Sequence, residues 1–134
     1  MSGDALQQGP QSKNVLVVDD NDEFREFVRT ALELVDYRVL EATDGEGAMV
    51  AVSQTKTLDL VVCDVMLPGD KGPEIMRKVR EVFPDTKVIF MSGYIAEDIV
   101  NQDVEDILAT GGVFLQKPFP TRKLLEVVHE MLGV

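Results

Sequence analysis

Residues 15–20 read VLVVDD and residues 58–64 read LDLVVCD, and both runs end on aspartate after an apolar, largely β-branched stretch. Strands that are covered on both faces of a parallel sheet have such near-continuous apolar runs. Between the two runs, and again further along the chain, lie longer segments whose apolar residues recur three and four positions apart, the spacing of a helix face. Because short strands alternate with helical segments, the sequence predicts an α/β domain with a parallel sheet.

Five strand–helix repeats follow one another from Asn14 onward. Strands are expected at Val15–Val18, Tyr37–Glu41, Leu58–Cys63, Lys87–Met91 and Gly112–Leu115. Helices are expected at Asp22–Val35, Glu46–Gln54, Pro73–Val82, Ala96–Ala109 and Thr121–Leu132. Right-handed crossovers between five such units favour a flavodoxin-like five-stranded parallel sheet of order 2-1-3-4-5, flanked by five helices.

The composition is that of one globular domain: 134 residues, of which 45% are hydrophobic and 28% charged. Residues 1–12 carry no apolar period and are interpreted as a flexible tail or linker, which leaves residues 13–134 as the domain. The formal charge of −11 argues against direct nucleic acid binding. The sequence shows neither a membrane-spanning apolar run nor a signal peptide, and its single cysteine, Cys63, fits a reducing compartment, so we expect a cytoplasmic protein without membrane association.

Polar residues follow four of the expected strands at their carboxyl ends. They are Asp19 and Asp20 after the first strand, Asp64 after the third, Ser92 after the fourth and Lys117 after the fifth. In open α/β sheets ligands bind beyond these ends, so we expect the five side chains to converge. Adjacent carboxylates cannot easily both stay ionised beside a third unless a cation neutralises them, and oxygen ligands with room for water and phosphate suit Mg²⁺. The sequence therefore predicts a magnesium site at this edge.

A carboxylate nucleophile, a metal ion, a lysine and a hydroxyl are sufficient for phosphoryl transfer, in which catalysis is mainly positioning and charge neutralisation. Asp64 is the expected nucleophile. Each residue also has a simpler interpretation, because Asp64 and Ser92 both stand close to turn-forming residues. Cys63 is interpreted as a packing residue and His129 as a surface residue. It is the joint placement of the polar groups at four strand ends that favours a functional site.

Four motifs carry a resemblance to a known family. VLVVDDND, LVVCDVMLPGDKG, VIFMSGY and VFLQKPF occur in this order, and together they resemble the motifs of response regulator receiver domains, the CheY-like domains of two-component signalling. The resemblance runs from about Lys13 to the last helix. It implies a phosphorylation switch rather than an enzyme, which takes a phosphoryl group from a donor and loses it slowly. Lys71 departs from the commonest pattern, in which many relatives carry an acid.

The resemblance also implies residue roles. Asp64 would accept the phosphoryl group from a phosphohistidine of a histidine kinase or histidine phosphotransfer protein. Asp20, Asp64 and the backbone carbonyl of Met66 would bind Mg²⁺, and Asp19 would help through a water molecule. Lys117 would contact a phosphoryl oxygen and would precede a cis peptide bond to Pro118.

In the family, phosphorylation is read out on one surface. Ser92 would move toward the phosphoryl group and draw Phe114 inward, so that the face built by the fourth helix, fifth strand and fifth helix (α4-β5-α5 in the family) would bind a downstream protein.

Several alternatives stay open. The chain resembles either a stand-alone regulator or the receiver segment of a hybrid sensor histidine kinase. A phosphate-independent interaction module on the same scaffold is the main alternative function. A magnesium phosphatase of the aspartate-nucleophile type is disfavoured, because the residue two after Asp64 is Met66 rather than an acid.

Overall fold

A computed structural model describes residues 9–67, 69–93 and 101–134 of the chain. Five parallel strands form the main sheet: β1 (Asn14–Val18), β2 (Arg38–Ala42), β3 (Leu60–Asp64), β6 (Lys87–Ser92) and β7 (Val113–Gln116). Their order is β2-β1-β3-β6-β7, which is the predicted order 2-1-3-4-5 once the main-sheet strands alone are counted. The flavodoxin-like fold is confirmed.

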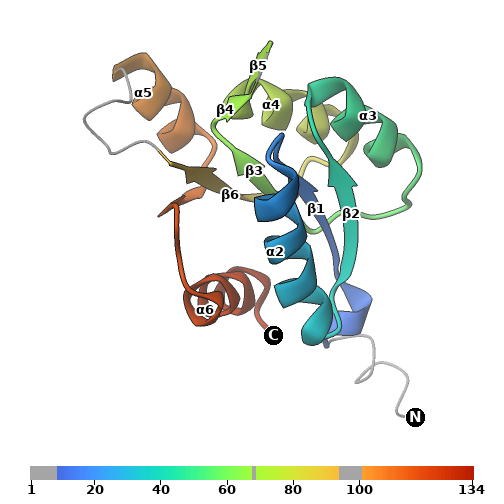
Figure 1. Cartoon of the computed structure of the whole chain (residues 1–134). Helices are drawn as coiled ribbons and strands as arrows, with labels where there is room; N and C mark the ends of the chain where they lie inside the picture. Colours follow the sequence, from blue (N-terminus) through green and yellow to red (C-terminus); the bar gives the residue numbers. More distant parts are fainter. Residues whose placement is uncertain (1–8, 68, 94–100) are drawn as a thin grey trace.

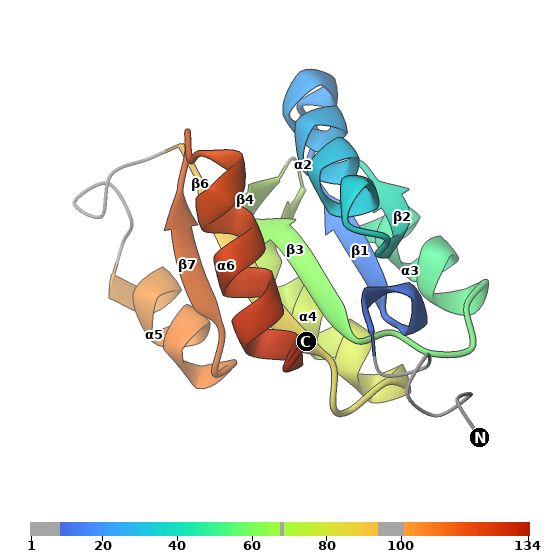
Figure 2. The same cartoon turned by 90° about the horizontal axis from the view of Figure 1, so that it is seen from below.

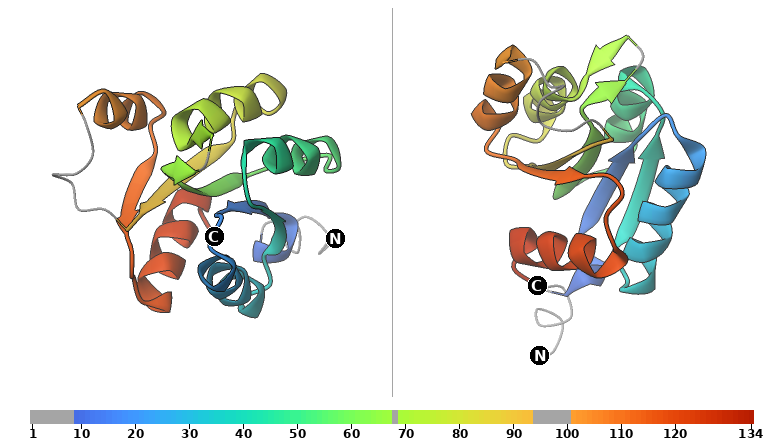
Figure 3. Two further views of the ribbon diagram at one scale, coloured as in Figure 1. Left: turned by 45° about the horizontal axis from the view of Figure 1, so that its top comes forward. Right: turned by 60° about the vertical axis from the view of Figure 1, so that its left-hand side comes forward.

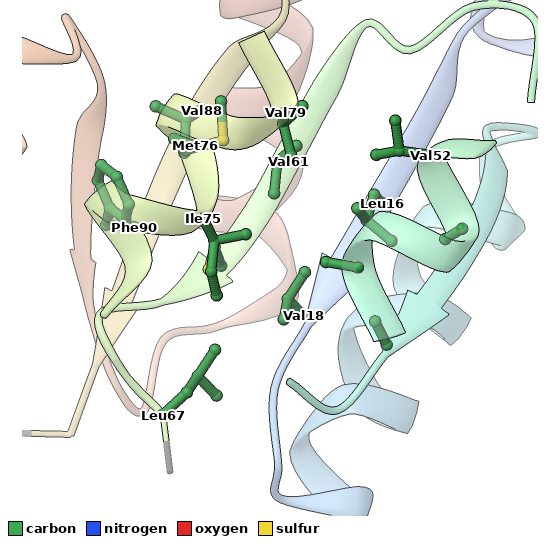
Figure 4. Close-up of a cluster of buried hydrophobic side chains, with 14 of the residues drawn as sticks. Leu16, Val18, Val52, Val61, Leu67, Ile75, Met76, Val79, Val88 and Phe90 are labelled. Atoms are coloured by element: carbon green, nitrogen blue, oxygen red, sulfur yellow. The ribbon is translucent and has the colours of Figure 1, made fainter. Parts of the chain in front are cut away.

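Helices cover both faces of this sheet. α2 (Asp22–Leu34) and α6 (Thr121–Leu132) lie on one side, and α3 (Gly45–Ser53), α4 (Gly72–Val82) and α5 (Asn101–Ala109) lie on the other (Figures 1, 2 and 3). Alternate residues of β1 supply the two cores, because Leu16 and Val18 pack on the α3–α4–α5 side and Val15 and Val17 on the α2–α6 side. Figure 4 shows the first of these cores, with side chains of α3 and α4 meeting those of the strands.

Local signals in the sequence fix where the helices begin and end. The side chain of Asn21 accepts a hydrogen bond from the Phe24 amide (2.9 Å) and caps α2, and Asp44 caps α3 through the Gly47 amide (2.7 Å). Pro73 lies in the first turn of α4, where its missing N–H costs nothing. Gly133 ends α6 in the left-handed conformation at φ 69°.

The register of the parallel strands brings their carboxyl ends to one edge. Val18 of β1 pairs with Cys63 of β3, and Asp64 at the end of β3 pairs with Met91 of β6. Ser92, the last residue of β6, pairs with Gln116, the last residue of β7. This register therefore holds the residues that follow β1 and β7 beside the residues that end β3 and β6.

The observed strands are shifted by one or two residues from the predicted ranges, as at Leu60–Asp64 for the predicted Leu58–Cys63. Leu58 is instead held by its carbonyl, which accepts the Thr86 hydroxyl (2.8 Å). Of the predicted helix Ala96–Ala109, residues 96–100 lie outside the described residues. No helix in the described ranges is long and apolar enough to cross a membrane.

Two features were not predicted. A small hairpin, β4 (Met66–Leu67) paired antiparallel with β5 (Asp70–Lys71), follows β3 directly. Within the segment 1–12, residues Pro10–Ser12 form one turn of 3-10 helix, η1, whose Gln11 carbonyl accepts a hydrogen bond from Arg38 of β2 (2.6 Å).

Candidate functional site

Asp19, Asp20 and Asp64 form an acid cluster at the carboxyl edge of the sheet. One carboxylate oxygen from each residue lies within 4.8 Å of the others. Asp19 is 0% exposed and Asp64 8%, whereas Asp20 is exposed. Two acids are thus embedded in the protein and the third faces solvent, and all three lie together at the strand ends, as the sequence predicts.

Backbone amides and one lysine hold the two buried carboxylates. Asp19 accepts the Asn21 amide on Oδ1 (2.9 Å) and Lys117 Nζ on Oδ2 (2.7 Å). Asp64 accepts the Met66 amide on Oδ1 (2.9 Å) and Lys117 Nζ on Oδ2 (2.8 Å). One ammonium therefore bridges the carboxylates at the ends of β1 and β3, across 98 and 53 residues of chain.

Lys117 is positioned by the end of β7 and the turn that follows it. Its backbone amide donates to the Ser92 carbonyl (2.7 Å), which ties the end of β6 to the end of β7. The peptide bond to Pro118 is cis, as the family resemblance implies. The side chain is 15% exposed, so most of its length is withdrawn from water.

Burial and pairing act in opposite directions on these groups. Burial raises the pKa of Asp64 above its ordinary value, although the hydrogen bonds from Lys117 and the Met66 amide oppose this shift. Burial opposes the charged form of Lys117, but its hydrogen bonds to Asp19 and Asp64 prevail and raise its pKa. The ammonium is thus stabilised by the same carboxylates that it neutralises.

The residues present fit a magnesium ion. Three carboxylates face a single ammonium, so the cluster keeps an excess of negative charge that a divalent cation neutralises. The donors are hard oxygen atoms, and the exposed Asp20 gives the cluster a side open to water, both of which suit Mg²⁺ rather than a softer metal.

The two predicted switch residues lie on the neighbouring strands β6 and β7. Ser92 is 0% exposed at the end of β6. Phe114 on β7 is half-buried and packs against the core on the α3–α4–α5 side. Met66 begins the β4–β5 hairpin and is 44% exposed. The structure therefore brings Asp19, Asp20, Asp64 and Lys117 together and places Ser92 at the next strand end.

Three further residues around this site were missed in the sequence. Asn21 binds Asp19 and caps α2, and Phe24 places its ring 4.5 Å from Lys117 Nζ. Arg25 donates from Nη1 to the Asp19 carbonyl (2.9 Å) and pairs with Asp22 (2.8 Å). The cap preference of Asn21 was the only sequence signal available.

The other two candidates in the sequence have structural partners. Cys63 is 0% exposed at the end of β3, which agrees with the packing role, and its pKa is raised by burial. His129 is half-buried rather than a free surface residue, because its Nδ1 lies 2.6 Å from the hydroxyl of the buried Tyr37.

The chain belongs to the response regulator receiver domain family, whose profile matches residues 15–129. It is similar to the sensor kinase CckA of Brucella abortus, with 38% identity over 122 residues, which is 90% of this chain and 13% of the kinase. It is also similar to the response regulator receiver protein CpdR of Brucella abortus, with 30% identity over 120 residues, covering 90% of this chain and 97% of CpdR. The CheY-like receiver domain protein of Methanospirillum hungatei JF-1 has a solved structure with a TM-score of 0.80 at 26% identity, covering 90% and 94% of the two chains.

These matches confirm the resemblance seen in the four motifs. Receiver domains are phosphorylation switches of two-component signalling rather than classical enzymes, and the relatives of this chain include both a sensor kinase and response regulators. The chain spans only a small part of the kinase but nearly the full length of CpdR.

Proposed function

We propose that this chain is the phosphoacceptor of a two-component phosphorelay, in which Asp64 takes a phosphoryl group from the phosphohistidine of a histidine kinase or of a histidine phosphotransfer protein. The observation that carries the proposal is the Lys117 ammonium, which lies 2.8 Å from an Asp64 oxygen and 2.7 Å from an Asp19 oxygen. A fixed positive charge beside the acceptor oxygen is what an incoming phosphoryl group requires.

The transfer balances with the groups at hand. An Asp64 oxygen attacks phosphorus and forms a mixed anhydride, while the phosphorus–nitrogen bond of the donor breaks and its electron pair returns to the imidazole nitrogen, which takes up a proton. Asp19, Asp20, Asp64 and the carbonyl of Met66 would hold Mg²⁺, which would neutralise carboxylate and phosphoryl oxygens when bound.

Phosphorylation then shifts a conformational equilibrium. The phosphoryl group offers Ser92 and Lys117 new contacts in one arrangement only, and this difference in contact energy biases the population. Because Ser92 ends β6 and Phe114 lies on the neighbouring β7, movement of Ser92 makes room for Phe114 to turn inward. Loss of the Ser92 hydroxyl would leave phosphorylation possible and remove this response.

The readout is the face formed by α5, β7 and α6, and a downstream protein binds there. Among the described residues of this face, Leu108 is 69% exposed, Val104 38% and Val113 37%, and the exposed Glu105 adds negative charge to α5. The partner therefore presents an apolar patch bordered by basic groups. We place the protein in the cytoplasm, where such kinases deliver phosphoryl groups and where its single buried thiol stays reduced.

The test is intact-protein mass spectrometry after incubation with acetyl phosphate or phosphoramidate, with and without Mg²⁺. Wild type, Asp64→Asn and Asp85→Asn are compared, because Asp85 is an exposed acid just before β6, at the opposite end of the strand from the acid cluster. We expect a single magnesium-dependent phosphoryl adduct in wild type and Asp85→Asn and none in Asp64→Asn. A folded wild type that takes no adduct with either donor would refute the proposal and favour a phosphate-independent interaction module.

A further inference from the structure

An aromatic cluster lies under the Lys117 ammonium. Lys117 Nζ is 4.5 Å from the centroid of the Phe24 ring, and this ring meets the edge of Phe119 at 5.3 Å and 90°. Phe27 completes the cluster, with its centroid 5.5 Å from Phe24 and 6.2 Å from Phe119. Phe119 is buried, and Phe24 and Phe27 are half-buried. Of these three rings, Phe24 is the one that contacts the ammonium.

Phe24 is fixed by the same residues that fix the acid cluster. Its backbone amide donates to the side chain of Asn21, and the Asn21 amide donates to Asp19 Oδ1. Asp19 in turn accepts a hydrogen bond from Lys117 Nζ on Oδ2, and this Nζ lies over the Phe24 ring. These four residues form a closed loop of contacts, so the place of the ring relative to the ammonium is set by the start of α2.

The ring differs from the other partners of Lys117 in what it does during the reaction. Asp19 and Asp64 each have oxygens that a metal ion or a phosphoryl group also uses, so their bonds to the ammonium change when the site is loaded. The negative face of an aromatic ring attracts an ammonium, most strongly where water is largely excluded, and neither the metal nor the phosphoryl group uses that face.

We propose that Phe24 is a positioning residue for Lys117: its ring keeps the ammonium beside the acid cluster when the carboxylates bind a metal ion or a phosphoryl group. The proposal rests on phosphoryl transfer to Asp64 as the proposed function. Without the ring, the Lys117 side chain has to become ordered at the moment when the phosphoryl group arrives. The transfer is slower because this ordering costs free energy.

The test compares Phe24→Leu, Phe24→Tyr and Phe27→Leu with wild type. Phe24→Leu removes the ring, Phe24→Tyr keeps it, and Phe27→Leu removes a neighbouring ring of the same cluster as the matched control. The first readout is the NMR shift of the Lys117 side-chain methylene protons, which a nearby ring face moves upfield. The second is the rate constant of phosphorylation by acetyl phosphate at saturating Mg²⁺ and at pH 7.

We expect the upfield shift in wild type, Phe24→Tyr and Phe27→Leu and its loss in Phe24→Leu. The rate constant should fall about five-fold in Phe24→Leu, the equivalent of about 1 kcal/mol, and stay near wild type in the other two variants. An unchanged Lys117 shift in Phe24→Leu, or a rate constant equal to or above that of Phe27→Leu, would overturn the inference. If wild type takes no phosphoryl group at all, the proposed function fails, and the NMR shifts still decide whether Phe24 positions Lys117.

Discussion

Gly72, the first residue of α4, lies against the end of β3. Its replacement by alanine probes how closely the helix approaches Asp64, the proposed phosphoacceptor. A β-carbon at this position would lie 2.9 Å from the carbonyl oxygen of Asp64 and 2.9 Å from Cε1 of Phe90. Both distances are shorter than a carbon atom tolerates. Neither neighbour can give way easily, because one is strand backbone and the other is a ring that is 0% exposed. The helix is also tied in place, since the Gly72 amide donates to the Val65 carbonyl (2.8 Å).

The expected cost follows from these contacts. Extra atoms forced into a packed region cost about 1–3 kcal/mol. Alanine recovers part of this through its helix propensity, up to about 1 kcal/mol in a helix interior and less at the first residue of α4. We therefore expect Gly72→Ala to lower the free energy of unfolding by about 1–2 kcal/mol, which for a domain of this size lowers Tm by roughly 3–8 °C.

Urea unfolding followed by circular dichroism measures this difference at constant m-value. Gly93→Ala is the matched control, because a β-carbon there has no heavy atom within 4 Å among the described residues, and we expect its stability to stay within about 0.5 kcal/mol of wild type. Because the added methyl group presses on the Asp64 carbonyl, Gly72→Ala should also accept phosphate from acetyl phosphate more slowly. A Gly72→Ala protein as stable as Gly93→Ala would refute the reasoning, because the close approach of α4 to β3 would then be absent.

Three further predictions concern Asp36, Tyr37 and Cys63. Asp36 lies at φ 72°, a conformation that is strained for most residues other than glycine, so Asp36→Gly should raise the urea midpoint and add up to about 1 kcal/mol of stability. Burial raises the pKa of Tyr37 to about 12; the folded state therefore keeps this proton to higher pH than the unfolded state, and stability should fall by about 1.4 kcal/mol per pH unit between roughly pH 10 and 12. Tyr37→Phe should lack this pH-dependent loss of stability. A free energy of unfolding that falls equally with pH in wild type and Tyr37→Phe would contradict the assignment. Cys63 is fully buried with a raised pKa, so iodoacetamide should leave the native protein unmodified and label it once urea unfolds it; rapid native labelling would show that the end of β3 opens.

Most of the fold could be predicted because its signals are local and repeated. Each main-sheet strand is a short apolar run, and each helix carries apolar residues at helical spacing, so tertiary contacts reinforce what the sequence favours locally. The β4–β5 hairpin could not be predicted in this way, since two residues per strand carry no readable period. Its turn depends on Gly69 at φ 81°, and its position depends on how closely α4 approaches β3.

The charged part of the site could also be predicted, because parallel strands bring their carboxyl ends to one edge whatever lies between them. Asp19, Asp64 and Lys117 are adjacent for this reason. The contact of Phe24 with Lys117 depends instead on the angle at which α2 leaves β1 and on the path of the turn after β7. The pairing of Tyr37 with His129 spans 92 residues and joins the turn after α2 to α6. No local pattern encodes contacts of this kind.

The position of Lys117 also explains how one site can be both stable and switchable. Its ammonium binds the two buried acids, while the third acid, Asp20, is exposed. The buried pair would be costly without a counter-charge, so Lys117 stabilises the fold before any metal or phosphoryl group is present. Asp19, Asp20 and Asp64 would hold a divalent cation, which would give the two buried acids a second positive partner. Under the proposed function Lys117 would then contact a phosphoryl oxygen at the same edge, so that the stability of the unphosphorylated site and its affinity for the phosphoryl group would depend on one side chain.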